Sequence, residues 1–334
     1  MCTAITWNTT EHYFGRTLDY TRSFGEEIIV TPRNYPFYFR HMGEKKTHFA
    51  MIGTALVSNG YPLYYDAVNE KGLCMAGLNF PGNAVYLDPV SGKENVAQFE
   101  LLPWILGQCD SVDAAKERLR RLHITSDNFA EGLPAAELHW IIADSHQAVT
   151  VEAVREGLHI YENSVGVLTN NPPFPMQMFA LNNYMHLTPE EPQNHLAKDL
   201  PLRPYSLGLG ALGLPGDLSS QSRFVRAAFT KLNAAAGSTE EENVNQFFHI
   251  LGTVQQTEGC CRTADGNCEK TIYTSCCNAD KGIYYYTTYG CHQITAVQLR
   301  QTELDAEELS RWSMQHAENI YSQNRAMVPA TRGP

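Results

Sequence analysis

Residues 1–20 read MCTAITWNTTEHYFGRTLDY, and this stretch decides the fold that we expect. Residues 2–7 are β-prone, the polar residues 8–10 suit a turn, and an extended pattern resumes at residues 12–14. The pattern predicts a β-hairpin whose first strand begins at Cys2. The segment 15–19 (GRTLD) follows this hairpin and carries Arg16 and Asp19 on one short stretch.

Cys2 is the residue with the most informative chemistry. Methionine aminopeptidases remove an initiator methionine that precedes a small side chain, so we expect Met1 to be removed and Cys2 to begin the mature chain. Such a residue holds a thiol beside an α-amine, and an amine with a pKa of about 7.7–8.0 can serve as the base for that thiol. Arg16 would favour the thiolate, and Asp19 would hold the amine through a hydrogen bond. The competing interpretation is an idle cysteine beside a surface Arg–Asp pair, which stabilises little.

Two asparagines are candidates for binding the oxyanion that forms when a nucleophile attacks a carbonyl group. Asn170 lies in residues 168–172 (LTNNP) at the end of a predicted strand, and Asn79 lies in residues 77–80 (GLNF) at the end of another. Amide N–H groups at these positions can donate to an oxyanion. A plain turn explains Asn-Asn-Pro as well. Arg223, near the start of a predicted helix, is either a buried charge partner for Asp19 or a solvated residue.

The rest of the chain alternates strand-rich and helix-rich blocks. Further strands are predicted at residues 27–31, 48–56, 73–80, 138–144, 148–155, 158–162, 165–168, 271–277, 282–287 and 293–299. Helices are predicted at residues 94–108, 112–122, 174–186, 222–236 and 241–251, and a charged helix is expected from Asp305. Hairpin-like turns between neighbouring strands favour an α+β fold of antiparallel sheets with helices outside them. We expect one domain over residues 2–334, with the polar, Pro-rich residues 186–207 as an excursion from it.

Composition narrows the class of protein. Hydrophobic residues make up 43% of the 334 residues and charged residues 18%, which is sufficient for a sizeable core. The net charge of −11 disfavours nucleic acid and anionic membranes as partners. The sequence shows no leader pattern and no apolar run of the roughly 18 residues that a membrane-spanning helix needs. We therefore expect a cytoplasmic protein that acts on a small molecule.

Nine cysteines are present, and six of them fall between residues 260 and 291. An odd number in a long chain without a leader argues against a disulfide framework. The close Cys pairs of zinc sites, two to four residues apart, are absent, so we expect neither a metal nor a cofactor. Two rival hypotheses stay open, namely a zinc or binding module on residues 260–291 and a papain-like Cys–His hydrolase. Metal analysis tests the first, and N-terminal acetylation tests the second, because it blocks an α-amine base and spares a histidine base.

Several segments together carry a resemblance to a known family. They are MCTAITW…HYFGRTLDY, GLCMAGLNFPGNAVY, VGVLTNNPPF, LGLPGDLSSQSRFVRAAF and TIYTSCCNADKGIYYYTTYG. In this order, from Cys2 to about Leu299, the chain resembles the choloylglycine hydrolase family, in particular its bacterial bile salt hydrolases, with penicillin V acylases as nearer cousins. The resemblance implies a four-layer αββα sandwich of two antiparallel sheets, the N-terminal-nucleophile fold. It also implies a homotetramer, with the excursion at residues 186–207 as its subunit-assembly loop.

The resemblance also implies roles for six residues. The family's nucleophile falls on Cys2, its assisting arginine on Arg16 and its amine-binding aspartate on Asp19. Its oxyanion-hole asparagines fall on Asn79 and Asn170, and its second arginine falls on Arg223. The position of Asn79 is more often tyrosine in penicillin V acylases, which favours the bile salt branch.

The implied reaction is hydrolysis of the amide between a bile acid and glycine or taurine, through a Cys2 thioester and without a cofactor. The alternative substrate is penicillin V or another N-acyl amide. A steroid needs a broad apolar pocket. Loops 20–24, 59–65 and 129–138 suit its walls, and two of them match substrate loops of the family. The pocket candidates are Phe24, Tyr61, Leu63, Phe129 and Leu133.

Overall fold

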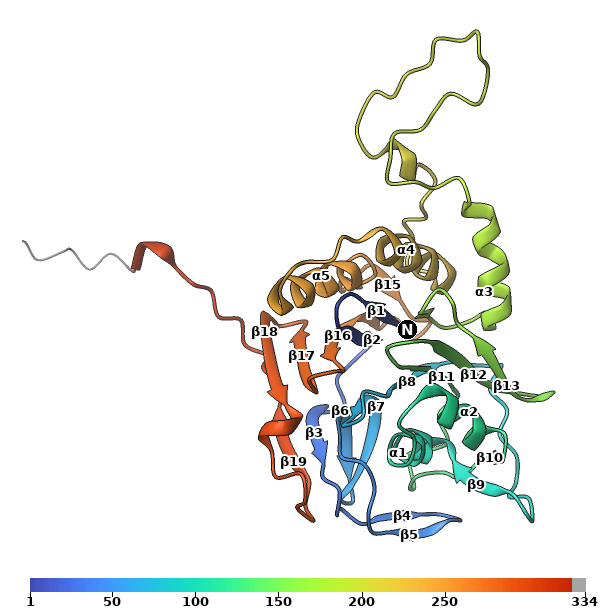
Figure 1. The fold of residues 1–334 in the computed structure, drawn as a ribbon, viewed down its shortest axis with the longest axis vertical. Helices are drawn as coiled ribbons and strands as arrows, with labels where there is room; N and C mark the ends of the chain where they lie inside the picture. Colours follow the sequence, from blue (N-terminus) through green and yellow to red (C-terminus); the bar gives the residue numbers. More distant parts are fainter. Residues whose placement is uncertain (326–334) are drawn as a thin grey trace, which may run out of the picture.

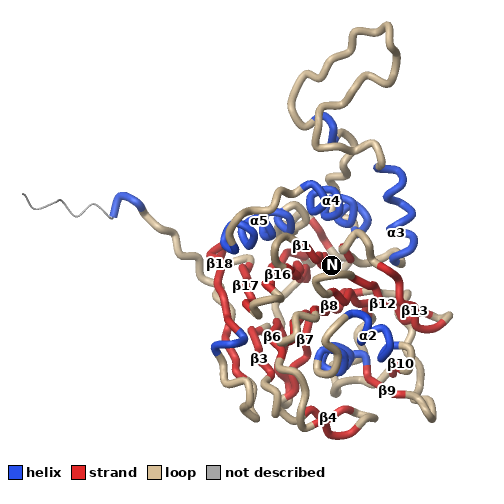
Figure 2. The backbone as a smooth tube through the Cα atoms, viewed as in Figure 1, coloured by secondary structure: helices blue, strands red, loops and turns tan. Residues whose placement is uncertain are grey.

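The computed structural model describes residues 1–325, and its body consists of two large antiparallel sheets packed face to face between layers of helices (Figures 1 and 2). Helices α4 and α5 cover one sheet, and α1 and α2 cover the other (Figure 1). The four-layer αββα sandwich of antiparallel sheets is therefore confirmed.

The first sheet is built around the N-terminal hairpin. Its seven strands are β1 (Cys2–Asn8), β2 (His12–Tyr20), β14 (Val167–Leu168), β15 (Cys261–Arg262), β16 (Cys268–Asn278), β17 (Ile283–Thr288) and β18 (Cys291–Gln298). They lie in the order β14-β1-β2-β16-β17-β18, with β15 paired to β16. Strand β1 thus pairs with β2 on one side and with the short β14 on the other, which brings residues 165–170 beside Cys2.

The second sheet has eight strands. They are β3 (Glu27–Thr31), β6 (Met51–Ser58), β7 (Tyr61–Asn69), β8 (Cys74–Asn79), β11 (Leu138–Ala143), β12 (Ala148–Val154), β13 (Gly157–Glu162) and β19 (Ser310–Ser313). In β3 the side chains of Ile28 and Val30 join the core that contains the first sheet, whereas Ile29 joins the core under α1. Because successive side chains of a strand point to opposite faces, an apolar run such as EIIVT marks a sheet covered on both faces.

Five α-helices lie within the described residues, and polar side chains cap three of them. They are α1 (Leu101–Leu106), α2 (Val112–Leu119), α3 (Phe174–Ala180), α4 (Ser220–Asn233) and α5 (Glu240–Gly252). Ser111 caps α2 by accepting a hydrogen bond from the Ala114 amide, and Ser219 and Thr239 cap α4 and α5 in the same way. No helix within residues 1–325 is long and apolar enough to cross a membrane.

One predicted helix is wrong, and another is correct only in its second half, where α1 lies. Between Asp305 and Arg325 the chain forms no α-helix but contains β19, which pairs with β3 at the sheet edge and places Arg311 against Glu27. Residues 94–97 form β9 (Glu94–Ala97), which pairs with β10 (Leu122–Thr125), and only then does the chain turn into α1. In both cases pairing with a strand distant in sequence overrides a local helical pattern. A further pair, β4 (Phe37–Phe39) with β5 (Gly43–Lys45), was not expected.

The excursion leaves the body as a long arm after α3 (Figure 1). Residues 185–208 contain no helix or strand, and the base of the arm closes through a hydrogen bond from the Thr188 amide to the Gly210 carbonyl, at 3.0 Å. The predicted domain reaches residue 334, and residues 326–334 lie outside the described part of the chain.

Candidate active site

Cys2 begins β1 and lies opposite Leu18 of β2, so the hairpin holds it between the two sheets. Cys2 is only 4% exposed, with Met1 preceding it. The Met1 amine donates to the Asp19 carbonyl at 2.6 Å and to the Glu269 carboxylate at 3.1 Å. The Cys2 amide nitrogen donates to Oδ1 of Asn170 at 2.8 Å. That nitrogen becomes the α-amine when Met1 is removed.

Asn170 connects several groups around Cys2 through hydrogen bonds. Besides the Cys2 amide, its Oδ1 accepts from Nη2 of Arg223 at 2.8 Å, and its Nδ2 donates to the Asn79 carbonyl at 2.7 Å. Its own amide donates to Oγ of Ser220 at 2.8 Å, and its carbonyl accepts from Nε2 of Gln177 at 2.7 Å. The side chain is therefore oriented from both ends, and one N–H of Nδ2 has no partner among the hydrogen bonds of residues 1–325.

Arg223 projects from the first turns of α4 onto β1. Its Nη1 donates to the Cys2 carbonyl at 2.5 Å and to Oγ1 of Thr3 at 2.7 Å. The side chain is fully buried, and burial lowers the pKa of Arg223 although the charges of Asp19 and Cys2 oppose that effect. Arg223 is thus a buried residue that clamps the first residues of the chain, not a solvated helix residue.

Arg16 crosses from the first sheet to the second. Its guanidinium donates to three main-chain carbonyls, those of Thr17 at 3.2 Å, Tyr65 at 3.0 Å and Gly77 at 2.5 Å. Burial works to lower the pKa of Arg16, but the charges of Cys2, Tyr273, Asp66 and Asp19 outweigh it and raise that pKa. The guanidinium is therefore a permanent positive charge in the environment of the Cys2 thiol.

Asp19 does not contact the Cys2 nitrogen while Met1 is in place. Its carboxylate accepts hydrogen bonds from Oγ1 of Thr271 at 2.6 Å and from Oγ1 of Thr17 at 3.1 Å. Burial raises the pKa of Asp19, and the Arg223 charge, the chain terminus and these hydroxyl groups oppose the rise. Asn170, not Asp19, is the direct acceptor of the Cys2 N–H.

Two β-bulges lie at this site. In β16, Thr271 pairs with Asp19 and Tyr273 pairs with Leu18, so Ile272 is an extra residue. In β7, Asp66 pairs with Thr54 and Tyr64 pairs with Ala55, so Tyr65 is an extra residue. Bulges re-aim side chains and carbonyls beside functional sites. Here they flank the carboxylate of Asp19 and the carbonyl of Tyr65 that receives Arg16.

Several residues whose hydrogen bonds hold the site were not predicted from the sequence. They are Asp66, Thr169, Gln177, Ser220, Thr271 and Ser275. Most are ordinary Ser, Thr or Gln residues whose role depends on partners far away in the chain, so no local pattern marks them. Asp66 offered a signal, because it interrupts the apolar stretch YPLYYDAVN.

Asn79 and the predicted pocket residues do not form one group, unlike the residues around Cys2. Asn79 ends β8 with an exposed side chain, and its contact with Asn170 is through its carbonyl. Tyr61 and Leu63 lie on β7, not on a loop, and the ring centre of Tyr61 lies 5.9 Å from that of Phe129. The Phe129 amide donates to the Leu133 carbonyl at 3.0 Å. Phe24 packs on Tyr20, with ring centres 5.1 Å apart, and not on this group.

The cysteine cluster does not form a metal site in the described chain. Cys276 and Cys277 are buried in β16, Cys291 is buried in β18, and Cys260 is exposed. All nine cysteines are free thiols. Within residues 1–325 no three His, Cys, Asp or Glu side chains gather in a way that could hold a metal ion.

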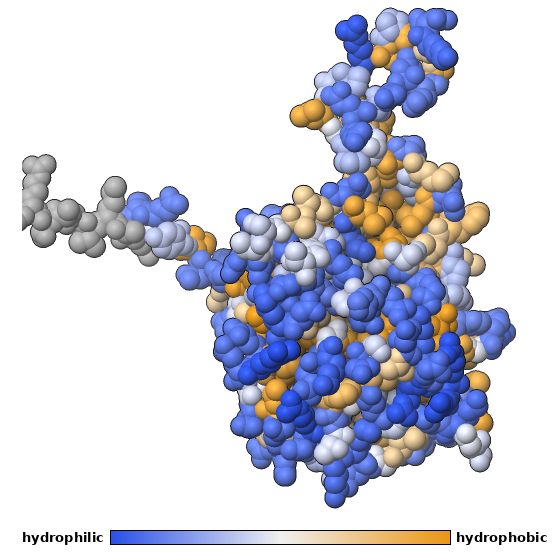
Figure 3. Space-filling view, viewed as in Figure 1, coloured by the Kyte–Doolittle hydropathy of each residue, from blue (hydrophilic) through white to orange (hydrophobic). Residues whose placement is uncertain are grey.

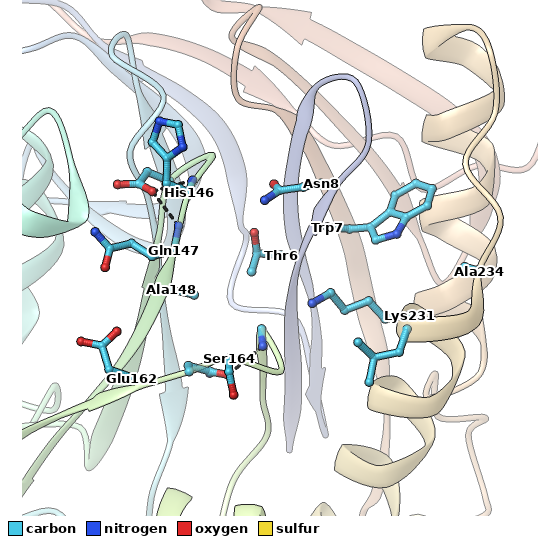
Figure 4. Close-up of a pocket in the computed structure, with 14 residues that line it drawn as sticks. Thr6, Trp7, Asn8, His146, Gln147, Ala148, Glu162, Ser164, Lys231 and Ala234 are labelled. Carbon is cyan, nitrogen blue, oxygen red and sulfur yellow. Dashed lines mark hydrogen bonds between the residues drawn. The ribbon is translucent and has the colours of Figure 1, made fainter. Parts of the chain in front are cut away.

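A cavity of about 600 Å³ lies beside the last residues of β1 (Figure 4), and we call it the second cavity to distinguish it from the site at Cys2. Thr6, Trp7 and Asn8 form one wall, and Lys231 reaches in from α4 (Figure 4). Nζ of Lys231 donates to the Val165 carbonyl at 2.6 Å, and burial lowers the pKa of Lys231 to about 8. None of the six predicted catalytic residues lines this cavity.

The sandwich with a cysteine at the start of its first strand is the architecture of N-terminal-nucleophile hydrolases. Residues 2–311 match the profile of the linear amide C–N hydrolases, choloylglycine hydrolase family, and the chain belongs to this family. It is 51% identical over 324 residues to the bile salt hydrolase/transferase of Lactiplantibacillus plantarum, across 97% of this chain and 100% of that relative.

Solved structures agree with this assignment. A variant of the conjugated bile acid hydrolase from Clostridium perfringens superposes with a TM-score of 0.90 at 34% identity, across 97% of this chain and 100% of that one. Penicillin V acylase from Agrobacterium tumefaciens shares the fold, with a TM-score of 0.73 at 19% identity over 93% of this chain and 91% of that one. The chain is thus an enzyme that hydrolyses linear amide C–N bonds.

Proposed function

We propose that this enzyme is a conjugated bile salt hydrolase, which cleaves the amide bond between a bile acid and glycine or taurine. The relatives support this substrate class, since the proteins from L. plantarum and C. perfringens carry bile salt or bile acid hydrolase names. The observation that carries the mechanism is the hydrogen bond of 2.8 Å from the Cys2 nitrogen to Asn170, which in turn is held by Arg223. It orients the first residue of the mature chain at a fixed, buried position.

In the proposed first step, the Cys2 thiolate attacks the amide carbonyl carbon and the carbonyl oxygen becomes an oxyanion. Nδ2 of Asn170 and the Asn79 side chain donate to that oxyanion. Donors fixed in place before the reaction stabilise developing charge well, because they need no reorganisation. The permanent charge of Arg16 favours the thiolate over the thiol.

Removal of Met1 supplies the base. The Cys2 nitrogen then becomes an α-amine, which accepts the thiol proton and passes it to the departing glycine or taurine nitrogen as the C–N bond breaks. Asp19 follows Leu18, which pairs with Cys2 across the hairpin, and its carboxylate is the proposed partner of the new amine. A water molecule then attacks the thioester with the amine as base, and the bile acid leaves. No metal or cofactor enters these steps.

The apolar acyl group is proposed to lie along Tyr61 at the start of β7 and along Phe129, which lies against it. Tyr61 and Phe129 already contact each other, with Leu133 on the adjoining turn. The remaining candidate contacts are Leu63, on the same strand as Tyr61, and Phe24, which packs on Tyr20 apart from this group. Their positions support a broad, weakly polar surface of the kind that a steroid needs.

We further propose a single-domain enzyme that assembles as a homotetramer in the cytoplasm. The arm at residues 186–207 and the neighbouring α3 expose large apolar side chains, which supports assembly through them. They are Met176, Phe179, Met185, Leu196, Leu200, Leu202, Tyr205 and Leu207. Figure 3 shows an apolar area where the arm leaves the body. Exposed apolar surface of this extent marks interaction sites. Nine free cysteines support a reducing compartment.

The test compares substrates and Cys2 variants. Wild-type enzyme is incubated separately with glycocholate, taurocholate and penicillin V, and the free amine or acid is quantified. We expect release of glycine or taurine, no hydrolysis by Cys2→Ala and little by Cys2→Ser. Intact mass should show that active protein lacks Met1. Preferential cleavage of penicillin V would reassign the substrate, and full activity of Cys2→Ala would refute the mechanism.

A further inference from the structure

Asp66 is a fully buried carboxylate that the proposed reaction does not use. It lies on β7 of the second sheet and is 1% exposed. Its oxygens accept hydrogen bonds from three hydroxyl groups of the opposite sheet, those of Tyr273 at 2.6 Å, Ser275 at 3.1 Å and Tyr284 at 2.5 Å. Burying a carboxylate costs free energy unless hydrogen bonds or an opposite charge offset the cost. Burial raises the pKa of Asp66, and the Arg16 charge and the three hydroxyl groups oppose that rise. A carboxylate held in this way beside an active site is a candidate for a functional role.

The surroundings of Asp66 connect it to Arg16. Oγ of Ser275, which donates to Asp66, also accepts the Arg16 amide at 3.1 Å. The residue next to Asp66 is Tyr65, whose carbonyl accepts Nη1 of Arg16 at 3.0 Å because of the bulge in β7. Among the ion pairs of residues 1–325, none joins Asp66 to Arg16, so the carboxylate acts on the guanidinium through its field and not through contact.

Arg16 itself is held by main-chain atoms. Three carbonyls fix its guanidinium, so its position does not depend on a bonded carboxylate. Its charge is opposed by the charges of Cys2, Asp66 and Asp19. Without Asp66 the guanidinium would act more strongly on Cys2, because interactions between buried charges are weakly screened.

We propose that Asp66 is a positioning residue of the catalytic site, whose carboxylate offsets part of the Arg16 charge at Cys2 and keeps the thiolate a strong nucleophile. This inference rests on the proposed role of Cys2 as nucleophile. A thiolate that is stabilised too strongly loses nucleophilicity, since nucleophilicity falls with the pKa of the thiol. Asp66 thus sets a compromise between forming the thiolate and keeping it reactive.

Other ionisable groups also lie around Cys2. The Cys2 charge acts on Arg16 of β2, Arg223 of α4 and Tyr65 of β7. Asp19 of β2 follows Leu18, which pairs with Cys2, and Glu269 of β16 contacts the terminal amine. Asp66 lies on the second sheet beside the Arg16 carbonyl ligands, so it can be changed without removing any of these groups.

The experiment measures the rate of Cys2 alkylation by iodoacetamide from pH 4 to pH 9, by mass spectrometry of the N-terminal peptide. In Asp66→Asn we expect the acid limb of the profile to shift to lower pH by at least about 0.5 pH unit, which is about threefold more thiolate on the acid side. The plateau rate at high pH should fall, and the acid limb of kcat/KM should shift in parallel. Asp144→Asn removes another largely buried, hydrogen-bonded carboxylate, at the second cavity, and should leave the limb in place.

A second pair of variants keeps the inference testable if Asp66→Asn alone does not fold. Arg16→Gln is compared with Arg16→Gln/Asp66→Asn. The double variant removes both buried charges together, so neither is left without the other. The added Asp66 substitution should again shift the acid limb of the alkylation profile to lower pH, by about 0.5 pH unit or more. A limb that stays or rises in both comparisons overturns the inference. Because alkylation needs no turnover, this result is independent of whether Cys2→Ala abolishes hydrolysis.

Discussion

At the residue scale, the site depends on a few buried polar side chains that each have several partners. Asn170 contacts the Cys2 nitrogen, Arg223 and the Asn79 carbonyl through one amide group. Removing such a group leaves the buried donors and acceptors around it without partners, which costs more than one ordinary hydrogen bond. Substitutions at these residues therefore call for a measurement of stability beside the measurement of activity.

We expect Asn170→Ala to reduce kcat by about 10²–10³-fold, the usual cost of losing one oxyanion donor. The enzyme should stay folded, because Ser220 and Gln177 bond the backbone of residue 170 and not its side chain. Steady-state kinetics with glycocholate and a circular-dichroism melt measure the two effects. Asn171→Ala serves as the control, since the Asn171 side chain bonds Pro81 and Asn83 instead. Equal losses in both variants would contradict the role of Asn170.

His12 gives a pH dependence of stability that has a definite sign. Burial lowers the pKa of His12 from 6.5 to about 4, despite the opposing charges of Asp280 and Asp144. Below pH 6.5 the unfolded chain takes up a proton that the folded chain refuses, so the contribution of His12 is present above pH 6.5 and is lost as pH falls toward 4. That window corresponds to about 3 kcal/mol.

Urea unfolding of wild type and His12→Gln at pH 7, 6, 5 and 4.5 measures this contribution. His12→Gln should be less stable at pH 7, because the bond of 2.6 Å between His12 and Thr6 is lost. Its free energy of unfolding should then fall less steeply with acid than that of wild type. Parallel slopes in the two proteins would show that His12 does not titrate in this way.

At the element scale, the site is assembled where β1, the β14 turn and α4 meet. Strand β1 carries Cys2, the segment after β14 carries Asn170, and α4 carries Arg223. The same three elements continue to the second cavity, where Gly166 lies between Thr6 and Lys231. The close fit at Gly166 therefore controls how these elements pack.

Gly166→Ala should destabilise the enzyme by about 2–3 kcal/mol. Gly166 has a φ of +62°, and an added Cβ would lie 2.5 Å from Nζ of Lys231 and 2.8 Å from Cγ2 of Thr6. Urea unfolding is compared with that of Gly216→Ala, where an added Cβ meets nothing within 4 Å. The double variant Gly166→Ala/Lys231→Ala should recover part of the loss, since it removes one of the clashes. Equal stability of the Gly166 and Gly216 variants would contradict this packing argument.

At the scale of the whole molecule, the arm at residues 186–207 carries apolar side chains that packing against the body does not bury. It carries large exposed apolar side chains on a segment without regular structure, and it closes at its base through Thr188 and Gly210. Ordering such a segment costs conformational entropy, which contacts with another subunit would offset.

If the chain assembles as the proposed tetramer, replacing residues 191–207 with a short Gly-Ser link should convert it into smaller species. Size-exclusion chromatography with light scattering gives the mass, and circular dichroism checks the fold. Leu196→Ser/Leu207→Ser should weaken assembly in the same direction, whereas Leu87→Ser, which changes an exposed leucine of the body, should not. A monomeric wild type, or a tetramer that survives the replacement, would refute the role of the arm.

Much of the fold was predictable because its signals are local. The hairpin of residues 2–20, the run of apolar strand segments and the capped helices α2, α4 and α5 follow from residues close together in the chain. The helix expected from Asp305 was wrong because β19 forms only by pairing with β3, which lies about 280 residues earlier. Strand pairing at that separation leaves no local pattern.

The candidate site divides in the same way. Sequence alone was sufficient to single out Cys2, Arg16, Asp19, Asn79, Asn170 and Arg223, because their residue types match the chemistry and the motifs of the family. Only the tertiary structure decided that Asn170 and not Asp19 receives the Cys2 N–H, that Arg16 crosses to carbonyls of the other sheet, and that Asp66 lies behind it. The physical reason is that hydrogen bonding and charge act over a few ångströms in space, and bulges and sheet stacking set those distances.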